Sequence, residues 1–196
     1  MDDDDRARVF LSIYTPTYAR PRLLARCIAS VEGQTIREEI QHVVVRDEVG
    51  VGIAGMFAEI PRHVDELVGR YVYVLQDDDW LAAPDVVEEL QTFVDALAEP
   101  PAVVMVRNRK GPHTYPEDWG RRPTWAHVDL GNYVVRRDVF AAHAGDFGKR
   151  YEGDFDFIDL LWRTGWKFAW CDLVFSRTEG WGQGRPESAF ATARRG

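Results

Sequence analysis

The sequence predicts an α/β protein with a mostly parallel β-sheet flanked by helices, followed by a smaller β/α region. Over residues 9–106, short apolar runs alternate with helical patterns in the order β-α-β-α-β-α-β, which gives a parallel sheet with helices on both faces. Polar or acidic residues directly follow three of these runs, at the sheet edge where such folds bind ligands. The length of 196 residues, with 45% hydrophobic residues, suits a single domain with a substantial core.

Four short apolar runs predict the strands of the first half. They are residues 9–14, 42–45, 71–75 and 102–106. Three helical patterns separate them, at residues 23–31, in the segment after VGVGIAGM that ends near Gly69, and at residues 86–97. Pro84 occupies the expected first turn of the third helix, and Pro100 and Pro101 end it.

The second half of the chain has a less regular pattern. Residues 107–125 are polar and contain prolines and glycines, which predicts a long loop of the kind that is usually functional or disordered. The shorter elements predicted after it are strands at 129–136, 167–170 and 173–175, and helices at 138–143 and 154–164. A glycine-rich and then polar tail follows Arg177. Asp2–Asp5, at the other end, are expected to be solvated and outside the fold.

The composition of the chain indicates which partners and which cellular compartment to expect. The net charge of −8 becomes −4 without the four aspartates at positions 2–5, and this mild acidity disfavours a broad nucleic-acid surface while leaving room for a local basic groove. Cys27 and Cys171 are expected to be buried free thiols in a reducing compartment. No stretch approaches the roughly 20 apolar residues of a membrane span, and the acidic amino terminus is unlike a secretory signal. We therefore expect a cytoplasmic protein with no membrane partner.

An acidic triplet directly follows the third predicted strand, in the stretch YVYVLQDDDWL. In an extended backbone Asp77 and Asp79 point to one side and Asp78 to the other. Two neighbouring carboxylates repel each other unless a cation lies between them, and Mg²⁺ or Mn²⁺ combines such oxygens with substrate phosphates. Asp47 follows the second strand at the same sheet edge. The pattern predicts a metal–diphosphate site; the simpler alternative is a solvated acidic turn that caps the next helix.

Four segments resemble family 2 glycosyltransferases of the GT-A fold, which is Rossmann-like. They are TPTYARPRLLARCIASVEGQT, GRYVYVLQDDDWL, GNYVVRRDVF and YEGDFDFIDLLWRTGWKFAW. Their order and spacing match the family over about residues 9–177. The resemblance implies a single GT-A-like domain over residues 1–196, with a nucleotide-sugar-binding half at 9–106, an acceptor-side half at 107–177 and a tail at 178–196.

The resemblance also implies roles for particular residues. The donor, a nucleotide-diphospho-sugar, would contact Thr15, Pro16, Tyr18, Arg20, Asp47, Asp77 and Asp78. Asp47 would hydrogen-bond uracil, which implies a UDP-sugar. Asp77 and Asp79 would hold Mn²⁺ or Mg²⁺ as the cofactor. Asp154 would be the general base that takes the proton of the acceptor hydroxyl in an inverting transfer.

Near the base and the second strand, the sequence departs from the family pattern. Arg46 precedes Asp47 where the family usually has a second aspartate. Gly153 replaces the glutamate that usually precedes the base. This change leaves the position of the base open. The alternatives for the base are Glu152 and Asp156.

A third departure concerns the metal ligands. The family often has a histidine near the carboxyl end as a further ligand, but no histidine follows His143 here. Glu179, or the backbone of the GWGQG loop at 180–184, would have to take that place. The same glycine-rich loop could instead close over the donor phosphates.

The acceptor is specified less closely. The loop at 107–125 interleaves basic and aromatic side chains, a combination that holds sugars by stacking, or single-stranded and flipped nucleotides. The small size of the chain resembles phage-type enzymes, some of which glycosylate hydroxymethylated bases in DNA within the host cytoplasm. The sequence thus leaves open DNA bearing hydroxymethylated bases, a glycan or a small molecule as acceptor. The oligomeric state also stays open.

Rival functions share parts of this pattern. A nucleotidyltransferase would use a similar sheet and metal but usually has a glycine-rich first loop, and TPTYARP has no glycine. A phosphotransferase with a nucleophilic aspartate would carry its acidic motif after the first strand rather than the third. A catalytically inactive nucleotide-sugar-binding module, favoured by the altered segment at Gly153, would bind the donor and turn nothing over.

Overall fold

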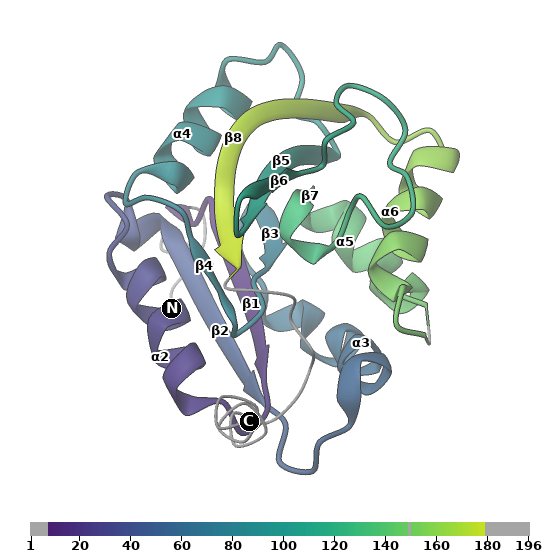
Figure 1. Cartoon of the computed structure of the whole chain (residues 1–196). Helices are drawn as coiled ribbons and strands as arrows, with labels where there is room; N and C mark the ends of the chain where they lie inside the picture. Colours follow the sequence, from purple (N-terminus) through teal and green to yellow (C-terminus); the bar gives the residue numbers. More distant parts are fainter. Residues whose placement is uncertain (1–7, 149, 179–196) are drawn as a thin grey trace.

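The computed structural model describes residues 8–148 and 150–178, and their strands form one mixed sheet (Figure 1). The strands are β1 (Leu11–Thr17), β2 (Ile40–Arg46), β3 (Tyr71–Val74), β4 (Asp79–Leu81), β5 (Val103–Lys110), β6 (His113–Tyr115), β7 (Tyr133–Arg136) and β8 (Phe168–Thr178). The α-helices are α2 (Pro21–Glu32), α3 (Gly52–His63), α4 (Val86–Asp95), α5 (Arg137–His143) and α6 (Gly153–Arg163). The predicted α/β class is confirmed.

The sheet order is β2-β1-β3-β7-β5-β8-β4, with β6 paired to β5. The strands β2, β1 and β3 are parallel, as the alternating pattern predicts. Strand β7 lies antiparallel between β3 and β5, so the fourth strand of the first half is not adjacent to the third. β5 and β8 are again parallel, and β4 closes the edge antiparallel to β8. Chain order alone does not specify this insertion.

The helices cover the two faces of the sheet (Figure 1). α2 and α4 pack on one face with apolar side chains such as Cys27 and Leu90, and α3, α5 and α6 pack on the other with Phe57, Phe140 and Phe157. Strand β3 serves both layers because Tyr71 and Tyr73 belong to the first cluster, and Val72 and Val74 to the second. A continuous apolar run in a strand is therefore explained by burial on both faces.

Several predicted boundaries are wrong in the second half. β5 continues to Lys110 and pairs with β6, which replaces the first part of the long loop predicted at 107–125. The two short strands predicted at 167–170 and 173–175 are one strand, β8, which shifts register against β5. In the first half, a further strand that the sequence does not predict, β4, begins at Asp79, the last residue of the acidic triplet. The extended β5, the continuous β8 and the additional β4 are neighbours in the sheet, which brings their polar side chains together.

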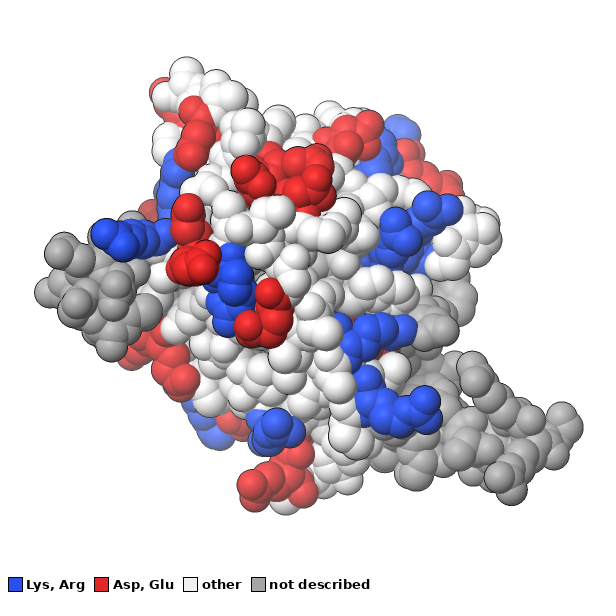
Figure 2. Space-filling view, turned by 90° about the vertical axis from the view of Figure 1, so that its left-hand side faces the viewer, with Lys and Arg blue, Asp and Glu red and all other residues white. Residues whose placement is uncertain are grey.

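The described residues show the state of the cysteines, the charge on one face and the character of the helices. Cys27 and Cys171 are buried and free, as predicted. On the face covered by α2 and α4, acidic groups are scattered among basic ones, and the described part of this face has no continuous basic surface (Figure 2). None of the helices in the described part of the chain is long and apolar enough to cross a membrane.

A close approach of backbones gives a prediction for stability. A Cβ atom at Gly69 would lie 2.4 Å from the backbone nitrogen of Ser12 in β1. We expect Gly69→Ala to lower the free energy of unfolding by about 1–3 kcal/mol, as overpacking usually does. Gly145→Ala is the matched control because a Cβ there meets nothing within 4 Å, and it should stay within about 0.5 kcal/mol of wild type. Urea unfolding measures both; equal stabilities would contradict the prediction.

Candidate functional site

A cavity of about 310 Å³ opens where the carboxyl ends of β1 and β3 meet the start of α3, the end of β5 and the start of α6. Ligands of open α/β sheets bind at this edge. The lining residues are Pro16, Arg20, Ile53, Met56, Phe57, Gln76, Asp79, Lys110, Tyr115, Trp125, Ala126, His127, Val128, Asp129, Asn132, Tyr151, Glu152, Asp154, Phe155 and Thr178. Residues from both halves of the chain therefore share one cavity.

The first carboxylate of the triplet, Asp77, is fully buried and has partners on both oxygens. Thr17 donates a hydrogen bond to Oδ2 over 2.6 Å, and a guanidinium nitrogen of Arg20 lies 2.8 Å from Oδ1. Burial raises the pKa of Asp77 to about 6, against the lowering effects of Thr17 and Arg20. Asp77 thus anchors the first loop to the triplet.

Oδ1 of Asp77 accepts no hydrogen bond but lies in the ion pair with Arg20, whereas the second carboxylate, Asp78, has only one oxygen in an ion pair. Its Oδ2 lies 3.2 Å from Arg20, while its Oδ1 is buried without a hydrogen-bond partner among the described residues. Its backbone carbonyl accepts a hydrogen bond of 2.9 Å from Arg26, whose guanidinium lies 3.9 Å from the ring centre of Trp80. This stacking holds Trp80 on Arg26, outside the cavity lining.

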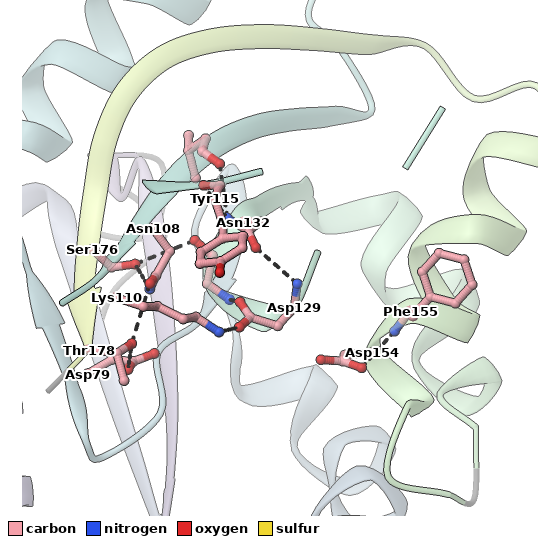
Figure 3. A network of polar contacts seen from close by, with 12 residues as sticks. Asp79, Asn108, Lys110, Tyr115, Asp129, Asn132, Asp154, Phe155, Ser176 and Thr178 are labelled. Atoms are coloured by element: carbon pink, nitrogen blue, oxygen red, sulfur yellow. Dashed lines mark hydrogen bonds and ion pairs between the residues drawn. The ribbon is translucent and has the colours of Figure 1, made fainter. Parts of the chain in front are cut away.

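The third carboxylate, Asp79, starts β4 and reaches the cavity. Thr178 of β8 donates a hydrogen bond to its Oδ1, and the same hydroxyl lies 3.4 Å from Asn108 of β5 (Figure 3). Asn108 in turn donates to Ser176, which also accepts from Tyr73. Burial and the neighbouring Asp78 raise the pKa of Asp79. A buried polar network of β3, β5 and β8 therefore positions this carboxylate.

Lys110 lies at the centre of the cavity wall. It extends from the end of β5 and forms an ion pair with Asp129, between the network at Asp79 and the start of α6 (Figure 3). Asp129 also accepts a hydrogen bond of 2.9 Å from the amide of Gly131. Burial lowers the pKa of Lys110, while the carboxylates of Asp79 and Asp154 raise it. The cavity thus contains a cation supplied by the protein itself.

Asp154 lies in the first turn of α6 and points across the cavity towards Lys110 and Asp129 (Figure 3). Its Oδ1 accepts a hydrogen bond of 2.8 Å from the amide of Phe155. Burial raises the pKa of Asp154 to about 6, and Lys110 and the start of the helix oppose this rise. A carboxyl group with such a pKa accepts a proton readily near neutral pH.

The two alternatives for the base lie in different places. Glu152 lines the cavity beside Asp154. Asp156 points elsewhere: Arg150 donates to it over 2.8 Å, and it does not line the cavity. The glycine at 153 has a steric cause, because a Cβ there would lie 2.3 Å from the carbonyl oxygen of Gly148.

The residues predicted to bind the donor are only partly brought together. Pro16 and Arg20 line the cavity. Thr15 lies beneath it, fully buried, with its hydroxyl 2.9 Å from His42. Tyr18 packs over Gly50, where a Cβ would lie 2.7 Å from its ring.

Asp47 closes the loop after β2. Its two oxygens accept hydrogen bonds of 2.7–2.8 Å from the amides of Val49, Gly50 and Val51, and these bonds lower its pKa. Both oxygens are thus occupied by this turn, and Asp47 does not line the cavity. The nucleoside contact predicted for it remains a prediction.

Several cavity residues escape the sequence reasoning. Gln76, Asp129, Asn132 and Thr178 line the cavity, but the sequence assigns them no role, although Gln76 and Asn132 lie within two of the segments that resemble the family. Lys110 was expected only as one of several basic residues of a loop. The available signal is the alternation of Asn108 and Lys110 along an extended β5, but the polar composition of this stretch favours a loop instead.

The fit of a divalent cation can be judged from the donors present. No group of three histidine, cysteine or carboxylate side chains among the described residues forms a preorganised metal site. A nucleotide-bound Mg²⁺ or Mn²⁺ needs only one or two carboxylates besides phosphates and water. Asp79 lines the cavity, and the neighbouring Asp78, which does not line it, repels Asp79 and has one oxygen in neither a hydrogen bond nor an ion pair among the described residues. These two carboxylates fit that need if Asp78 turns towards the bound cation. The suggested ligands at 179–184 lie outside the described residues.

Comparisons with known proteins place this arrangement in a fold. Neither a scan against protein-family models nor a search of curated proteins finds a match. Solved structures do match. The structure of S. aureus TarS 1–349 has a TM-score of 0.64 at 11% identity, covering 87% of this chain, and its complex with UDP-GlcNAc gives 0.61 at 12% identity, covering 89%.

A second protein matches over almost the whole chain. The mannosyltransferase PcManGT from Pyrobaculum calidifontis, in complex with GDP-Man and Mn²⁺, has a TM-score of 0.64 at 14% identity and covers 95% of this chain. The chain spans about three fifths of the length of TarS 1–349 and of PcManGT, 60% and 61% respectively. The chain therefore has the fold of the GT-A glycosyltransferases, as the resemblance in its sequence predicts.

Proposed function

We propose that the protein is a metal-dependent, inverting glycosyltransferase that uses a nucleotide-diphospho-sugar. The observation that carries the proposal is one cavity that holds Asp79 of the acidic triplet and, from a distant part of the chain, Asp154. A cation site for a diphosphate and a carboxylate with a raised pKa are the two groups that such a transfer needs. The complexes of TarS with UDP-GlcNAc and of PcManGT with GDP-Man and Mn²⁺ support a donor of this class.

The donor would enter from the side of Pro16, Arg20 and Gln76. We assign its base as uracil, since Asp47 lies at the end of β2 where the resemblance places the nucleoside contact. Asp78 and Asp79 would hold Mn²⁺ or Mg²⁺, a revision of the pair Asp77 and Asp79 expected from sequence. The revision rests on the surroundings of Asp77, which has a hydrogen bond from Thr17 on one oxygen and an ion pair with Arg20 on the other. When bound, the cation would neutralise charge on the leaving diphosphate.

The transfer would follow from the groups on either side of the cavity. The acceptor hydroxyl, hydrogen-bonded to Asp154, attacks the anomeric carbon of the donor sugar from the face opposite the diphosphate. Asp154 takes the hydroxyl proton as the new bond forms and the diphosphate departs. The start of α6 and Lys110 keep Asp154 ionised before the reaction.

Lys110 provides a test of this electrostatic arrangement. The other charged groups that line the cavity with Asp154 are Arg20, Lys110, Asp79, Asp129 and Glu152. Burial raises the pKa of Asp154, and the positive charge of Lys110 lowers it. Lys110→Met removes that charge, so the pKa should rise and the acid limb of the pH profile of kcat/KM should move to higher pH by about one unit. Lys110→Arg should keep the limb near its wild-type position. An unchanged limb in Lys110→Met would show that Lys110 does not control the base.

Ligand-induced stabilisation tests the function itself. Thermal unfolding is measured with a panel of UDP, GDP, CDP and their sugars, each with Mn²⁺ and with chelator. A nucleotide at about 100 times its Kd adds roughly 2.7 kcal/mol of stability, or about 2–4 °C in a domain of this size. A metal-dependent shift with a UDP compound supports the proposal. The absence of a shift with every nucleotide would refute it.

Activity assays on the same protein distinguish two rival functions. A nucleotidyltransferase would release pyrophosphate from a nucleoside triphosphate rather than a nucleoside diphosphate from a nucleotide sugar. An inactive module would show the metal-dependent shift but would release nothing, even with acceptor present. Assays for the released nucleotide therefore complete the assignment.

A further inference from the structure

Two aromatic side chains on the acceptor side of the cavity are left largely in solvent. Trp125 is 61% exposed and Tyr151 is 65% exposed, yet both line the cavity that holds Asp154. In the described part of the chain, the other exposed large hydrophobic side chains are Val49 and Val51, which do not line it. Exposed apolar rings at the wall of a cavity mark a binding surface.

The backbone beside Trp125 is held in an unfavourable conformation. Ala126 has a φ of 66°, in the left-handed region that a residue with a Cβ adopts at a cost of about 1–2 kcal/mol. His127 follows and lines the same cavity, and its Nδ1 is buried without a hydrogen-bond partner among the described residues. The segment 125–127 thus combines an exposed indole ring with a buried polar atom that has no hydrogen-bond partner among the described residues.

The charges inside the cavity favour a neutral, hydroxyl-rich ligand next to these rings. The charged lining residues are the carboxylic acids Asp79, Asp129, Glu152 and Asp154 and the bases Arg20 and Lys110. Arg20 is paired with Asp77 and Asp78, and Lys110 with Asp129. Carboxylates accept hydrogen bonds from hydroxyl groups but repel the phosphates of a nucleic acid.

Four arginines on the surrounding acceptor side are also paired with carboxylates of the described chain. Arg122 lies 2.8 Å from Asp159, and Arg150 contacts Asp156. Arg107 is paired with Asp172, and Arg121 with Asp118. Proteins that bind DNA neutralise several backbone phosphates with arginine and lysine, and a flipped base brings its flanking phosphates with it. This pairing opposes such contacts.

We propose that the acceptor is an uncharged sugar whose ring stacks on Trp125, with Tyr151 beside it and a ring hydroxyl at Asp154. This inference rests on the proposed glycosyl transfer and names the substrate class of its acceptor subsite. The apolar C–H face of the sugar covers the indole ring, and its hydroxyls meet the carboxylates and His127. A hydroxymethylated base in DNA, which the sequence alone left open, is the competing acceptor.

Binding without turnover tests the subsite directly. Saturation-transfer NMR is recorded with UDP and Mn²⁺ present, using methyl glycosides of glucose, galactose, mannose and N-acetylglucosamine and their 1→4-linked disaccharides. We expect saturation of ring protons in at least one sugar and an affinity weakened about tenfold or more in Trp125→Ala. Sugar binding that is equal in Trp125→Ala and wild type, or absent for the whole panel, would overturn the inference.

A second tryptophan of the same segment supplies the control. Trp119 packs on Arg107 and Trp170 and does not line the cavity, so Trp119→Ala should keep the wild-type affinity for the sugar. Urea unfolding of each variant shows whether it is folded. Loss of sugar binding in folded Trp119→Ala to the same extent as in Trp125→Ala would contradict a specific role of Trp125.

The DNA alternative and the function itself have separate readouts. A single-stranded and a double-stranded oligonucleotide carrying 5-hydroxymethylcytosine are tested by the same binding measurement. One result would refute the sugar acceptor: either oligonucleotide binds, Trp125→Ala abolishes this binding, and no sugar of the panel binds. The transferase proposal would remain intact. If no nucleotide stabilises the protein in the thermal assay, the proposed function fails instead, whatever the sugars do.

Discussion

Asp154→Asn is expected to lower the rate of sugar transfer by about 10²–10⁴-fold and leave donor binding unchanged. The loss follows because an amide cannot take the acceptor proton, and general-base catalysis supplies a factor of this size. The amide oxygen can still accept the hydrogen bond of 2.8 Å from the amide of Phe155. The substitution therefore removes the basic group but keeps the position of the side chain. Single-turnover kinetics with saturating donor measure the rate of sugar transfer.

The same variant should be more stable than wild type at neutral pH. In the folded protein burial raises the pKa of Asp154 to about 6 from an ordinary value of 3.8. Its contribution to stability is therefore complete below pH 3.8 and is lost as the pH rises through 6. An asparagine does not ionise, so Asp154→Asn should gain on the order of 2 kcal/mol over wild type at pH 7.5 and little at pH 4.

Two control variants keep this prediction specific. Asp156→Asn removes a carboxylate that pairs with Arg150 outside the cavity, and it should retain most of the activity. Glu152→Gln removes the other carboxylate of the cavity wall next to the helix. A fully active Asp154→Asn together with an inactive Glu152→Gln would assign the base to Glu152. Urea unfolding at both pH values provides the stability differences.

The sequence predicts the fold better than the site because the two depend on different information. Strand β3 follows from its apolar run alone, since burial on both faces needs only apolar residues. The acidic triplet likewise lies at the end of β3, as expected of polar residues after a buried strand. The insertion of β7 between β3 and β5 is different, because strand pairing across such a distance depends on the whole sheet.

The residues at the centre of the cavity show the same limit. Lys110 and Thr178 lie on β5 and β8, whose pairing brings them near Asp79 only in three dimensions. In the sequence, the glycine at 153 indicates an altered base segment. The structure explains it by the closeness of the Gly148 carbonyl, which is a packing reason that leaves Asp154 in the cavity.

The second large effect is expected at the acidic triplet. Asp78→Asn and Asp79→Ala should each remove most of the Mn²⁺-dependent stabilisation by UDP, corresponding to a loss of affinity of at least about tenfold. The reason is that each variant takes away one of the two carboxylates that fit a cation bound to a diphosphate. Thermal unfolding with UDP, with and without Mn²⁺, measures the metal-dependent part separately from nucleotide binding.

Asp77→Asn distinguishes this pair of ligands from the pair that the sequence suggests. Asp77 is held by Thr17 and Arg20, so its replacement should weaken the contact with the first loop and leave the dependence on Mn²⁺ in place. If Asp77→Asn instead loses the Mn²⁺ dependence while Asp78→Asn keeps it, the ligands are Asp77 and Asp79. Arg20 and the cation would then lie on the same carboxylate, and the repulsion between their positive charges would weaken the ion pair of Arg20 with Asp77 when the donor binds.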